Sequence, residues 1–499
     1  MTELVTAANG REARMNRVWI VTMASTLTLT LACVKAKDPQ YKQEQGQKQP
    51  ATSQDTIPRD QLQGPPEEAE GVAIDTGIQP DQQSRIIIDG GSQGPGAGVD
   101  NSRNQSEIGG GTGIQYKPLN FTVTEQKIQE WVDQDKSKRG GAAEEYRYAY
   151  IPIEYLNDPK LANYARIGLS KALNSVAIDA DEIHSPEEAS ENYGVVYAIP
   201  IAKYWGDKAQ QKWNITARAQ SKRVFSPAPR LDLRPFDANA PVNAARLAYN
   251  LMHGGVYNQL IETPPRGAQL TRQIAGEVTH RMGVRKAITY GPRYAQRREL
   301  KDRPGSYWEA FDEFYGRPGE LMWINNRNPI PRFRRDGMVA DYGTVASEAW
   351  QHMKNGMIAY YIFGNANQER TRAELSFVRD PLNPKSGHVI TGFCAFCHIT
   401  GVQAAPNDMW KAIEEGRITG DAAERARQFW TDNKLIAEQY NEDRLIFQTA
   451  MQKIVLGISD GDKEWNEAVI AGADPREPIY TLVNHITGLR NGGDTTGMR

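Results

Sequence analysis

The stretch TGFCAFCHITG, residues 391–401, decides which fold we expect for the C-terminal part of this 499-residue chain. It contains Cys394, Cys397 and His398 in the pattern C-x-x-C-H. In this pattern each thiol can form a thioether with one vinyl group of a porphyrin, and the histidine that follows can ligate the iron. The sequence therefore predicts one covalently attached haem c, with Cys394 and Cys397 holding the porphyrin and His398 as the proximal ligand.

Three other interpretations of the cysteine pair stay open. A thioredoxin-like pair would stand between a strand and a helix near the start of a βαβ unit. A zinc site would need further ligands, and His388 and His398 flank the pair, although the spacing matches no common zinc finger. A chance occurrence is the third. The chain has three cysteines, and the remaining one, Cys33, lies in a different kind of motif.

The N-terminal stretch MNRVWIVTMASTLTLTLAC, residues 15–33, has a basic start, a short apolar run and a small residue before Cys33. This is typical of a lipoprotein signal peptide over residues 1–33, cleaved so that Cys33 is lipidated. A plain cleaved signal and an uncleaved anchor are the alternatives. We expect an exported protein, lipid-anchored on the periplasmic side or at the outer membrane of a bacterium. No other stretch is apolar enough to suggest a membrane span.

The composition and the charges of the rest of the chain allow further predictions. Residues 34–117 are rich in Gln, Gly, Pro, Ser, Asp and Lys, a composition that predicts a disordered tether. The balance of 59 Lys and Arg against 61 Asp and Glu gives no reason to expect nucleic-acid binding. Basic patches at Arg281–Arg303 and at Arg332, Arg334 and Arg335 are interpreted as solvated faces, with docking of an acidic redox partner or contact with a haem propionate as alternatives.

The remaining sequence predicts an α+β protein: a mixed α/β body over residues 118–385, followed by a mainly α-helical, cytochrome c-like haem module over residues 386–499. In the body, Asn355-Gly356 between two β-prone runs predicts a hairpin over residues 349–363. Pro200 suggests an edge strand over residues 194–204. The other predicted elements are helices that begin after Thr124 and at Pro159, a helix over 241–252, a strand over 373–378, and helices at 407–413, 421–430, 441–457 and 478–486.

The motifs YRYAYIPIEYLND, VVYAIPIAKYWG, NGMIAYYIF, GFCAFCHITGV and EDRLIFQTAM follow one another along the chain. In this order the chain resembles a group of largely uncharacterised exported bacterial proteins, cytochrome c domain-containing lipoproteins in which a large domain ends in a c-type cytochrome segment. The resemblance covers roughly residues 145–487. It implies haem binding for Cys394, Cys397 and His398 and says little about the pathway.

The sequence does not decide which residue is the distal ligand of the iron. Met451 lies at the distance beyond the motif where compact c-type cytochromes place a methionine ligand, but it also falls on an apolar helical stripe. The other candidates are His485, Met409, His388, His352 and an open iron. Trp410, Phe393 and Phe396 would pack near the porphyrin or simply in the core.

Three functions follow from these expectations. An electron carrier with an unspecified redox partner is the leading hypothesis. A haem-dependent oxidoreductase, such as a peroxidase or a dehydrogenase, is the second, although the sequence offers no set of catalytic acid and base residues for it. A haem-based sensor or structural lipoprotein is the third. The state of the sixth iron ligand separates the first from the other two.

Overall fold

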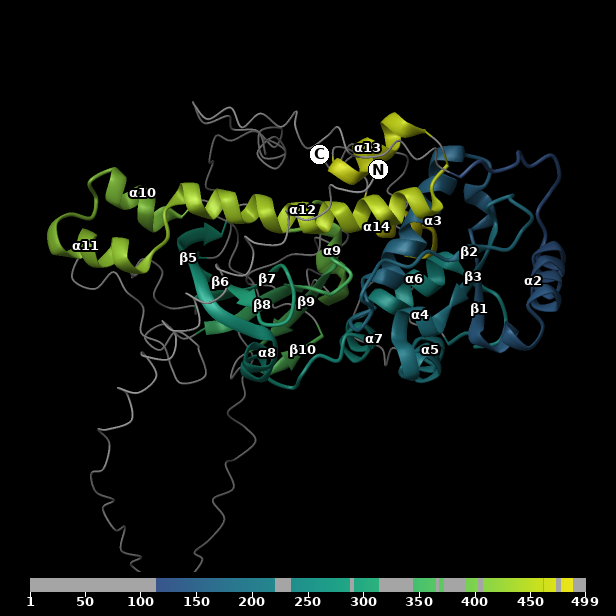
Figure 1. Ribbon diagram of the computed structural model, residues 1–499, viewed down its shortest axis with the longest axis horizontal. Coiled ribbons are helices and arrows are strands. Elements are labelled where there is room, and N and C mark those ends of the chain that lie inside the picture. Colours follow the sequence, from purple (N-terminus) through teal and green to yellow (C-terminus); the bar gives the residue numbers. More distant parts are fainter. Residues whose placement is uncertain are drawn as a thin grey trace, which may run out of the picture. The chain divides into compact units, whose positions relative to one another are not determined.

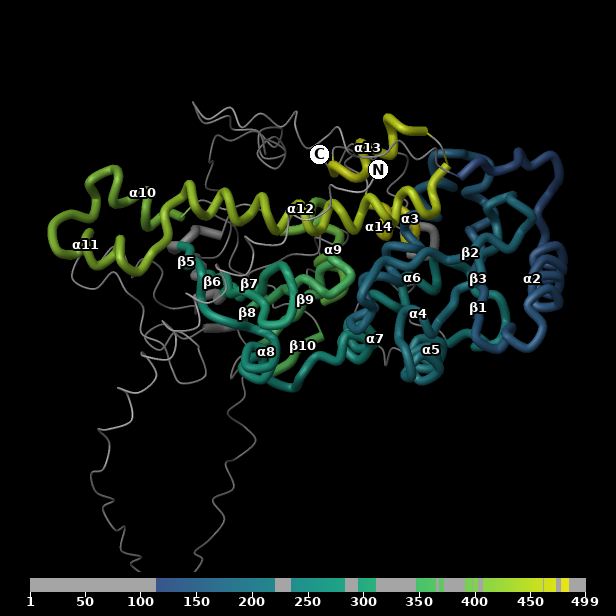
Figure 2. Tube along the Cα trace, viewed as in Figure 1, coloured from purple at the N-terminus to yellow at the C-terminus, as the bar shows by residue number. Residues whose placement is uncertain are grey.

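The computed structural model describes residues 114–219, 235–287, 291–313, 344–364, 368–371, 391–402, 407–460, 462–472 and 477–487. The predicted signal peptide with Cys33, the tether up to residue 113, the strand over 373–378, His388 and the patch at Arg332 lie outside these residues. For Cys397 and His485 only the backbone is described. Within the described part the protein is mixed α and β, with two separate sheets, as the α+β prediction required. Figure 1 shows the elements, and Figure 2 traces the chain through them.

The smaller sheet has the strand order β2-β3-β1-β4. Its strands are β1 (Tyr146–Tyr150), β2 (Glu187–Glu188), β3 (Val196–Pro200) and β4 (Val242–Asn243). The edge position predicted from Pro200 is wrong, because β3 pairs with β1 on one side and with the two residues of β2 on the other. Pro200 is the last residue of the strand, where its missing N–H removes no inner rung of the ladder.

The larger sheet is an antiparallel meander with the strand order β10-β9-β8-β7-β6-β5. Its strands are β5 (Ala275–Ala287), β6 (Gly291–Leu300), β7 (Ser306–Glu313), β8 (Thr344–His352), β9 (Ile358–Phe363) and β10 (Glu369–Arg370). The hairpin predicted around Asn355-Gly356 is confirmed as β8 and β9. Its loop has three residues rather than two, since the amide of Met353 still donates to the carbonyl of Met357 at 2.7 Å and Gly356 takes the left-handed φ of +85°.

Helices make up most of the remaining elements. Those before the larger sheet are α2 (Glu125–Arg139), α3 (Pro159–Asn174), α4 (Ile201–Trp205), α5 (Ala209–Ala217), α6 (Ala244–Met252), α7 (Gly254–Leu260) and α8 (Gly267–Ile274). Those after it are α9 (Cys394–Cys397), α10 (Asp408–Glu414), α11 (Gly420–Phe429), α12 (Asn433–Ile458), α13 (Lys463–Ala471) and α14 (Pro478–Thr487). The helix starts predicted after Thr124 and at Pro159 are confirmed, and Thr124 and Asp158 accept hydrogen bonds from the first turns of α2 and α3.

One predicted helix start is wrong. The long C-terminal helix does not begin at Asn441, because α12 starts eight residues earlier at Asn433. Its cap is Asp432, whose carboxylate accepts a hydrogen bond of 2.8 Å from the amide of Leu435. The extra turns carry Ile436 and Tyr440, which are buried and extend the apolar stripe toward the larger sheet.

The core does not divide at the boundary predicted between residues 385 and 386. A single hydrophobic cluster contains Tyr164 of α3, Trp308 of β7 and Met451 of α12, together with residues of α9 and α14. Helix α14 packs against α3 and α6, and α12 also contacts α3. The helices that follow the haem motif therefore complete the core of the preceding body. Ordered backbone also begins before residue 118, since Ile114 pairs with Asp460.

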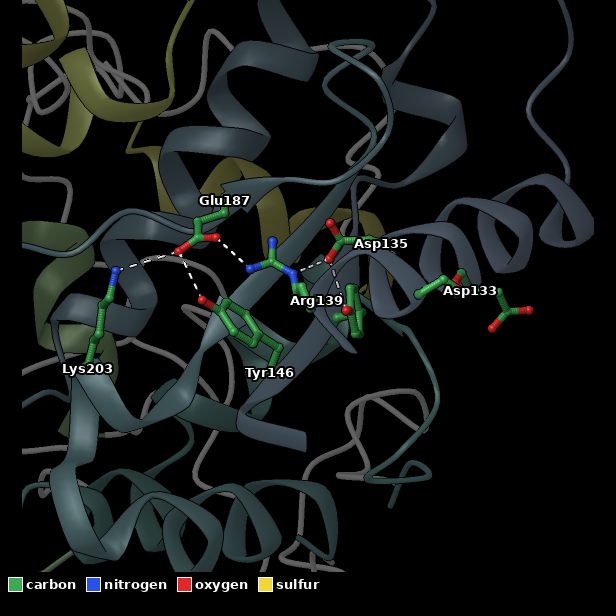
Figure 3. A network of polar contacts seen from close by, with 8 residues as sticks. Asp133, Asp135, Arg139, Tyr146, Glu187 and Lys203 are labelled. Carbon is green, nitrogen blue, oxygen red and sulfur yellow. Dashed lines mark hydrogen bonds and ion pairs between the residues drawn. The ribbon is translucent and has the colours of Figure 1, made fainter. Parts of the chain in front are cut away.

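A polar network fastens α2 to the smaller sheet (Figure 3). Arg139 donates to Asp135 within α2 and, at 2.8 Å, to Glu187 of β2. Its guanidinium also lies over the ring of Tyr146, 3.8 Å from the ring centre. Lys203 of α4 reaches the same Glu187 carboxylate at 3.6 Å. Every labelled charge in this group except that of Asp133 is matched by an opposite one, so the network stabilises the fold and offers no reactive group.

Candidate functional site

The C-x-x-C-H motif lies on a short helix that follows a 3₁₀ turn over Thr391–Phe393. The amide of His398 donates to the carbonyl of Cys394 at 3.1 Å, the i to i−4 bond of an α-helix. Cys394 and His398 are therefore one helical turn apart and face the same side. A thioether at residue 394 and an imidazole at residue 398 could in this way contact one porphyrin ring.

A hydrogen bond fixes the imidazole of His398. Its Nδ1 lies 3.0 Å from the carbonyl oxygen of Gly401, to which it can only donate, so the lone pair is on Nε2. The loop closes because the amide of Gly401 donates to the carbonyl of His398 at 3.1 Å. Gly401 has a φ of +90°, which a side chain would strain. A histidine whose Nδ1–H is held by a backbone carbonyl is oriented as metal-ligating histidines usually are.

The 3₁₀ turn before the motif packs closely against the end of α6. A Cβ at Gly392 would lie 2.2 Å from the backbone oxygen of Met252, so only glycine fits there. Phe393 and Phe396 stack on each other with ring centres 4.6 Å apart. They also contact Tyr249 and Tyr480, at 5.9 and 5.8 Å respectively. Both phenylalanines are buried in the core and set the orientation of α9.

Aromatic side chains of the larger sheet surround the His398 ring. Its centre lies 5.8 Å from that of Trp350 on β8 and 5.3 Å from that of Tyr360 on β9. Trp350 and Tyr360 are directly opposed in the β8–β9 ladder and therefore project from the same face of the sheet. The motif helix is thus seated on the sheet face that α12 also covers.

The same register continues across the sheet to a buried ion pair. His280, Arg297, Trp308, Trp350 and Tyr360 are opposed strand by strand from β5 to β9. Arg297 donates to both carboxylate oxygens of Asp443 on α12, at 3.1 and 2.9 Å. The indole N–H of Trp308 donates to Asp443 Oδ2 at 2.8 Å. Arg297 is 5 % exposed and Asp443 is fully buried.

The protonation states follow from these contacts. Burial by itself would raise the pKa of Asp443, but the hydrogen bonds and charge of Arg297, with the indole N–H, lower this pKa below its ordinary value. Burial lowers the pKa of His352, which is therefore neutral. Its Nδ1 accepts from the amide of Ser306 and its Nε2 donates to the backbone carbonyl of Asp443. Both nitrogens are thus used, and His352 is not placed to ligate iron.

The other candidates for the distal ligand are placed differently. Met451 is buried in the main core, one helical turn beyond Phe447, whose side chain would be 3.1 Å from a Cβ at Gly401. Met409 and Trp410 belong to a separate small cluster formed by α10 and α11, which has no member in common with the motif. His485 is described only in its backbone, on α14.

The described ranges contain neither a cluster of metal-ligating side chains nor a membrane-spanning helix. No group of three or more His, Cys, Asp or Glu side chains there is arranged to hold a metal ion. None of the described helices combines the length and the apolar composition needed to cross a bilayer.

Sequence reasoning missed the Arg297–Asp443–Trp308 group. Arg297 falls in the basic stretch interpreted as a solvated face, yet it is buried. The signal that could have found the group is in α12: Asp443 occupies a position of the stripe formed by Ile436, Tyr440, Phe447 and Met451, where every other residue is apolar or aromatic. A carboxylate on such a face needs a buried partner.

Comparison with known proteins adds no further identification, because no protein-family model, curated protein or solved structure matches this chain.

Proposed function

We propose that this protein is an exported, mono-haem c-type cytochrome that transfers electrons. The observation that carries the proposal is the geometry of the motif. Cys394 and His398 share one face of a short helix, and the Nδ1–H of His398 is committed to the carbonyl of Gly401. The bound haem would supply a one-electron iron couple.

The chain's own residues would hold this group and exclude water from it. Cys394 and Cys397 would form the two thioethers, and His398 Nε2 would ligate the iron. Gly401 keeps the imidazole from rotating. The rings of Trp350 and Tyr360 form an apolar wall beside His398, and a low local dielectric favours the less charged reduced iron. Met451 remains our proposal for the distal ligand.

We also propose that Cys33 anchors the protein in a membrane on the outer side of the cytoplasm. The support is the sequence Leu31-Ala32-Cys33 after a basic and apolar stretch. Haem is attached to a C-x-x-C-H motif on exported chains. Both proposals therefore place the protein outside the cytoplasm.

One purification tests both proposals. The full chain is produced together with a cytochrome c maturation system, and the haem is extracted with acidified acetone before the intact mass is measured. We expect the wild type to keep its haem and to carry acyl groups at residue 33. Cys394→Ser should have a single thioether or no haem but normal acylation, whereas Cys33→Ser should lose the acyl groups and keep the haem.

The two variants are thus matched controls for each other. A wild-type chain that releases all of its haem would overturn the cytochrome proposal, and an unmodified residue 33 would overturn the anchor alone. The reduced spectrum with carbon monoxide decides the function class. A six-coordinate iron that does not bind carbon monoxide supports electron transfer, and rapid binding would favour an oxidoreductase or a sensor.

A further inference from the structure

A line of aromatic rings connects His398 with helix α12 across the larger sheet. The ring centre of Trp350 lies 5.8 Å from that of His398 and 6.2 Å from that of Trp308. Trp308 in turn stacks on Tyr440 of α12 at 4.8 Å, with the two ring planes only 6° apart. Each step is a contact between neighbouring rings, so no gap of saturated chain interrupts the line.

The line differs from ordinary core packing at Trp308. The indole N–H donates to the carboxylate of Asp443, which burial and Arg297 keep in one place. A tryptophan that loses one electron becomes positively charged, and its N–H becomes far more acidic than in the neutral ring. A carboxylate at 2.8 Å stabilises this charge and can accept the proton, more strongly in the protein interior than in water. The positive charge of Arg297 offsets part of this effect but leaves the proton acceptor in position.

The far end of the line comes close to solvent. Tyr440 itself is buried, but Ala437 and Arg444, three residues before it and four after it on α12, are exposed. Residues at these spacings are neighbours on the same side of a helix. A redox partner that contacts this part of α12 would be separated from the ring of Tyr440 by the width of the helix, and the aromatic rings lead from there to His398.

We infer that Trp350, Trp308 and Tyr440 form a conduit for single electrons between a haem held by His398 and a one-electron donor or acceptor at the outer face of α12. The inference rests on the proposed function and adds the route to it. In the outward direction the ferrous iron is oxidised to ferric and the external acceptor is reduced by one electron. When the acceptor is a one-electron oxidant strong enough to oxidise an indole, such as a ruthenium(III) polypyridyl complex, Trp308 is oxidised and reduced again in between, and any proton it gives to Asp443 returns. With a milder acceptor the rings only bridge the transfer, and in both cases the net step moves one electron and no proton.

Flash photolysis tests the route in the haem-loaded full chain. Ala437→Cys, in a chain that also carries Cys33→Ser, is labelled with a ruthenium polypyridyl complex. A light flash in the presence of an oxidative quencher converts the label to ruthenium(III). The ruthenium(III) then takes one electron from the ferrous haem. We expect Trp308→Phe to slow the oxidation of the haem by about tenfold, equivalent to about 1.4 kcal/mol of activation free energy. Trp213→Phe is the matched control, since Trp213 is fully buried on α5 and outside the line. It should leave the rate unchanged.

A second measurement does not need the haem. In the labelled full chain with Cys394→Ser and Cys397→Ser, the same flash should produce the transient absorption of a tryptophan radical. That signal should be lost in Trp308→Phe and kept in Trp213→Phe. Trp350→Phe interrupts the line one ring nearer to His398, and it replaces Trp308→Phe in the first experiment if that variant does not fold.

The conduit would be overturned by equal haem oxidation rates in wild type, Trp308→Phe and Trp350→Phe. It would also be overturned by an equal radical signal in the haem-free Trp308→Phe and Trp213→Phe variants. A chain that binds no haem but gives the radical signal would refute the proposed function and leave only electron transfer from Trp308 to the outer face of α12 supported.

Discussion

At the scale of single residues, Asp443 is a fully buried carboxylate whose two oxygens both accept hydrogen bonds from buried side chains. It lies fully buried and accepts three hydrogen bonds through its carboxylate, two from Arg297 and one from Trp308. An ionised pair in the interior is tolerated when such bonds replace water around it. The pair therefore fixes the position of α12 on the sheet more than it adds to net stability.

Removing the charge of Asp443 should destabilise the fold, because Arg297 would keep a buried charge without a counterion. We expect Asp443→Asn to lower the free energy of unfolding by about 3 kcal/mol at pH 7. Since the pKa of Asp443 is lowered in the folded state, the difference should shrink as the pH falls below about 4, where the wild-type carboxyl also becomes protonated. Urea denaturation at several pH values measures both effects.

The matched control is Asp302→Asn. Asp302 pairs with Arg303 at 2.9 Å but is 56 % exposed. Its loss should change the free energy of unfolding by less than about 1 kcal/mol. Equal losses for the two variants would contradict the view that the Asp443 pair depends on its burial.

At the scale of elements, the sequence predicted those whose signals are local. Thr124 and Asp158 cap helices that the structure contains, and Asn355-Gly356 turns the hairpin between β8 and β9. Strands β5 to β7 were not predicted, because their residues 275–313 are largely charged or polar and only pairing with neighbours decides which side is buried. The start of α12 was placed too late, since Asp432 and Asn441 are both acceptable caps and tertiary burial of Tyr440 decides between them.

In the candidate site, too, the sequence predicted only the residues that belong to a local motif. Cys394, Cys397 and His398 follow from a contiguous motif. Trp308, Trp350 and Asp443 come together only through sheet register and helix packing across more than 130 residues, as the Trp308–Asp443 bond shows. No local pattern around Trp308 indicates that it lies one ring away from the neighbours of His398.

Met451 belongs to α12, and its role can be separated from core packing. If its sulfur is the distal ligand, Met451→Ala should abolish the sulfur-to-iron charge-transfer band of the oxidised protein, lower the reduction potential and let the reduced form bind carbon monoxide. Met409→Ala is the control, because Met409 is equally buried but lies in the separate cluster. Should Met451→Ala keep the band and only lose about 2–5 kcal/mol of stability, Met451 is a core residue and the ligand lies elsewhere.

At the scale of the whole molecule, elements of both sheets share the main core of the described structure, beside two smaller clusters, one between α2 and the smaller sheet and one of α10 and α11. Helix α12 contacts α3, which packs beside the smaller sheet, and holds the larger sheet through Asp443. Lys171 of α3 forms a buried ion pair of 2.8 Å with Glu477, next to the start of α14. The predicted haem module therefore has no core separate from that of the body, apart from the small cluster of α10 and α11.

A shared core should unfold in one step. We expect tryptophan fluorescence, which reports both sheets, and Soret absorbance, which reports the haem ligands, to give the same midpoint in urea. Lys171→Met leaves Glu477 without its buried partner and should move both midpoints to lower urea by the same amount. The control is Lys463→Met, because Lys463 is 78 % exposed and pairs only within α13, and it should move neither midpoint. Two separate transitions, with Lys171→Met shifting only one of them, would instead mean that the haem segment folds independently and that a boundary near residue 385 exists.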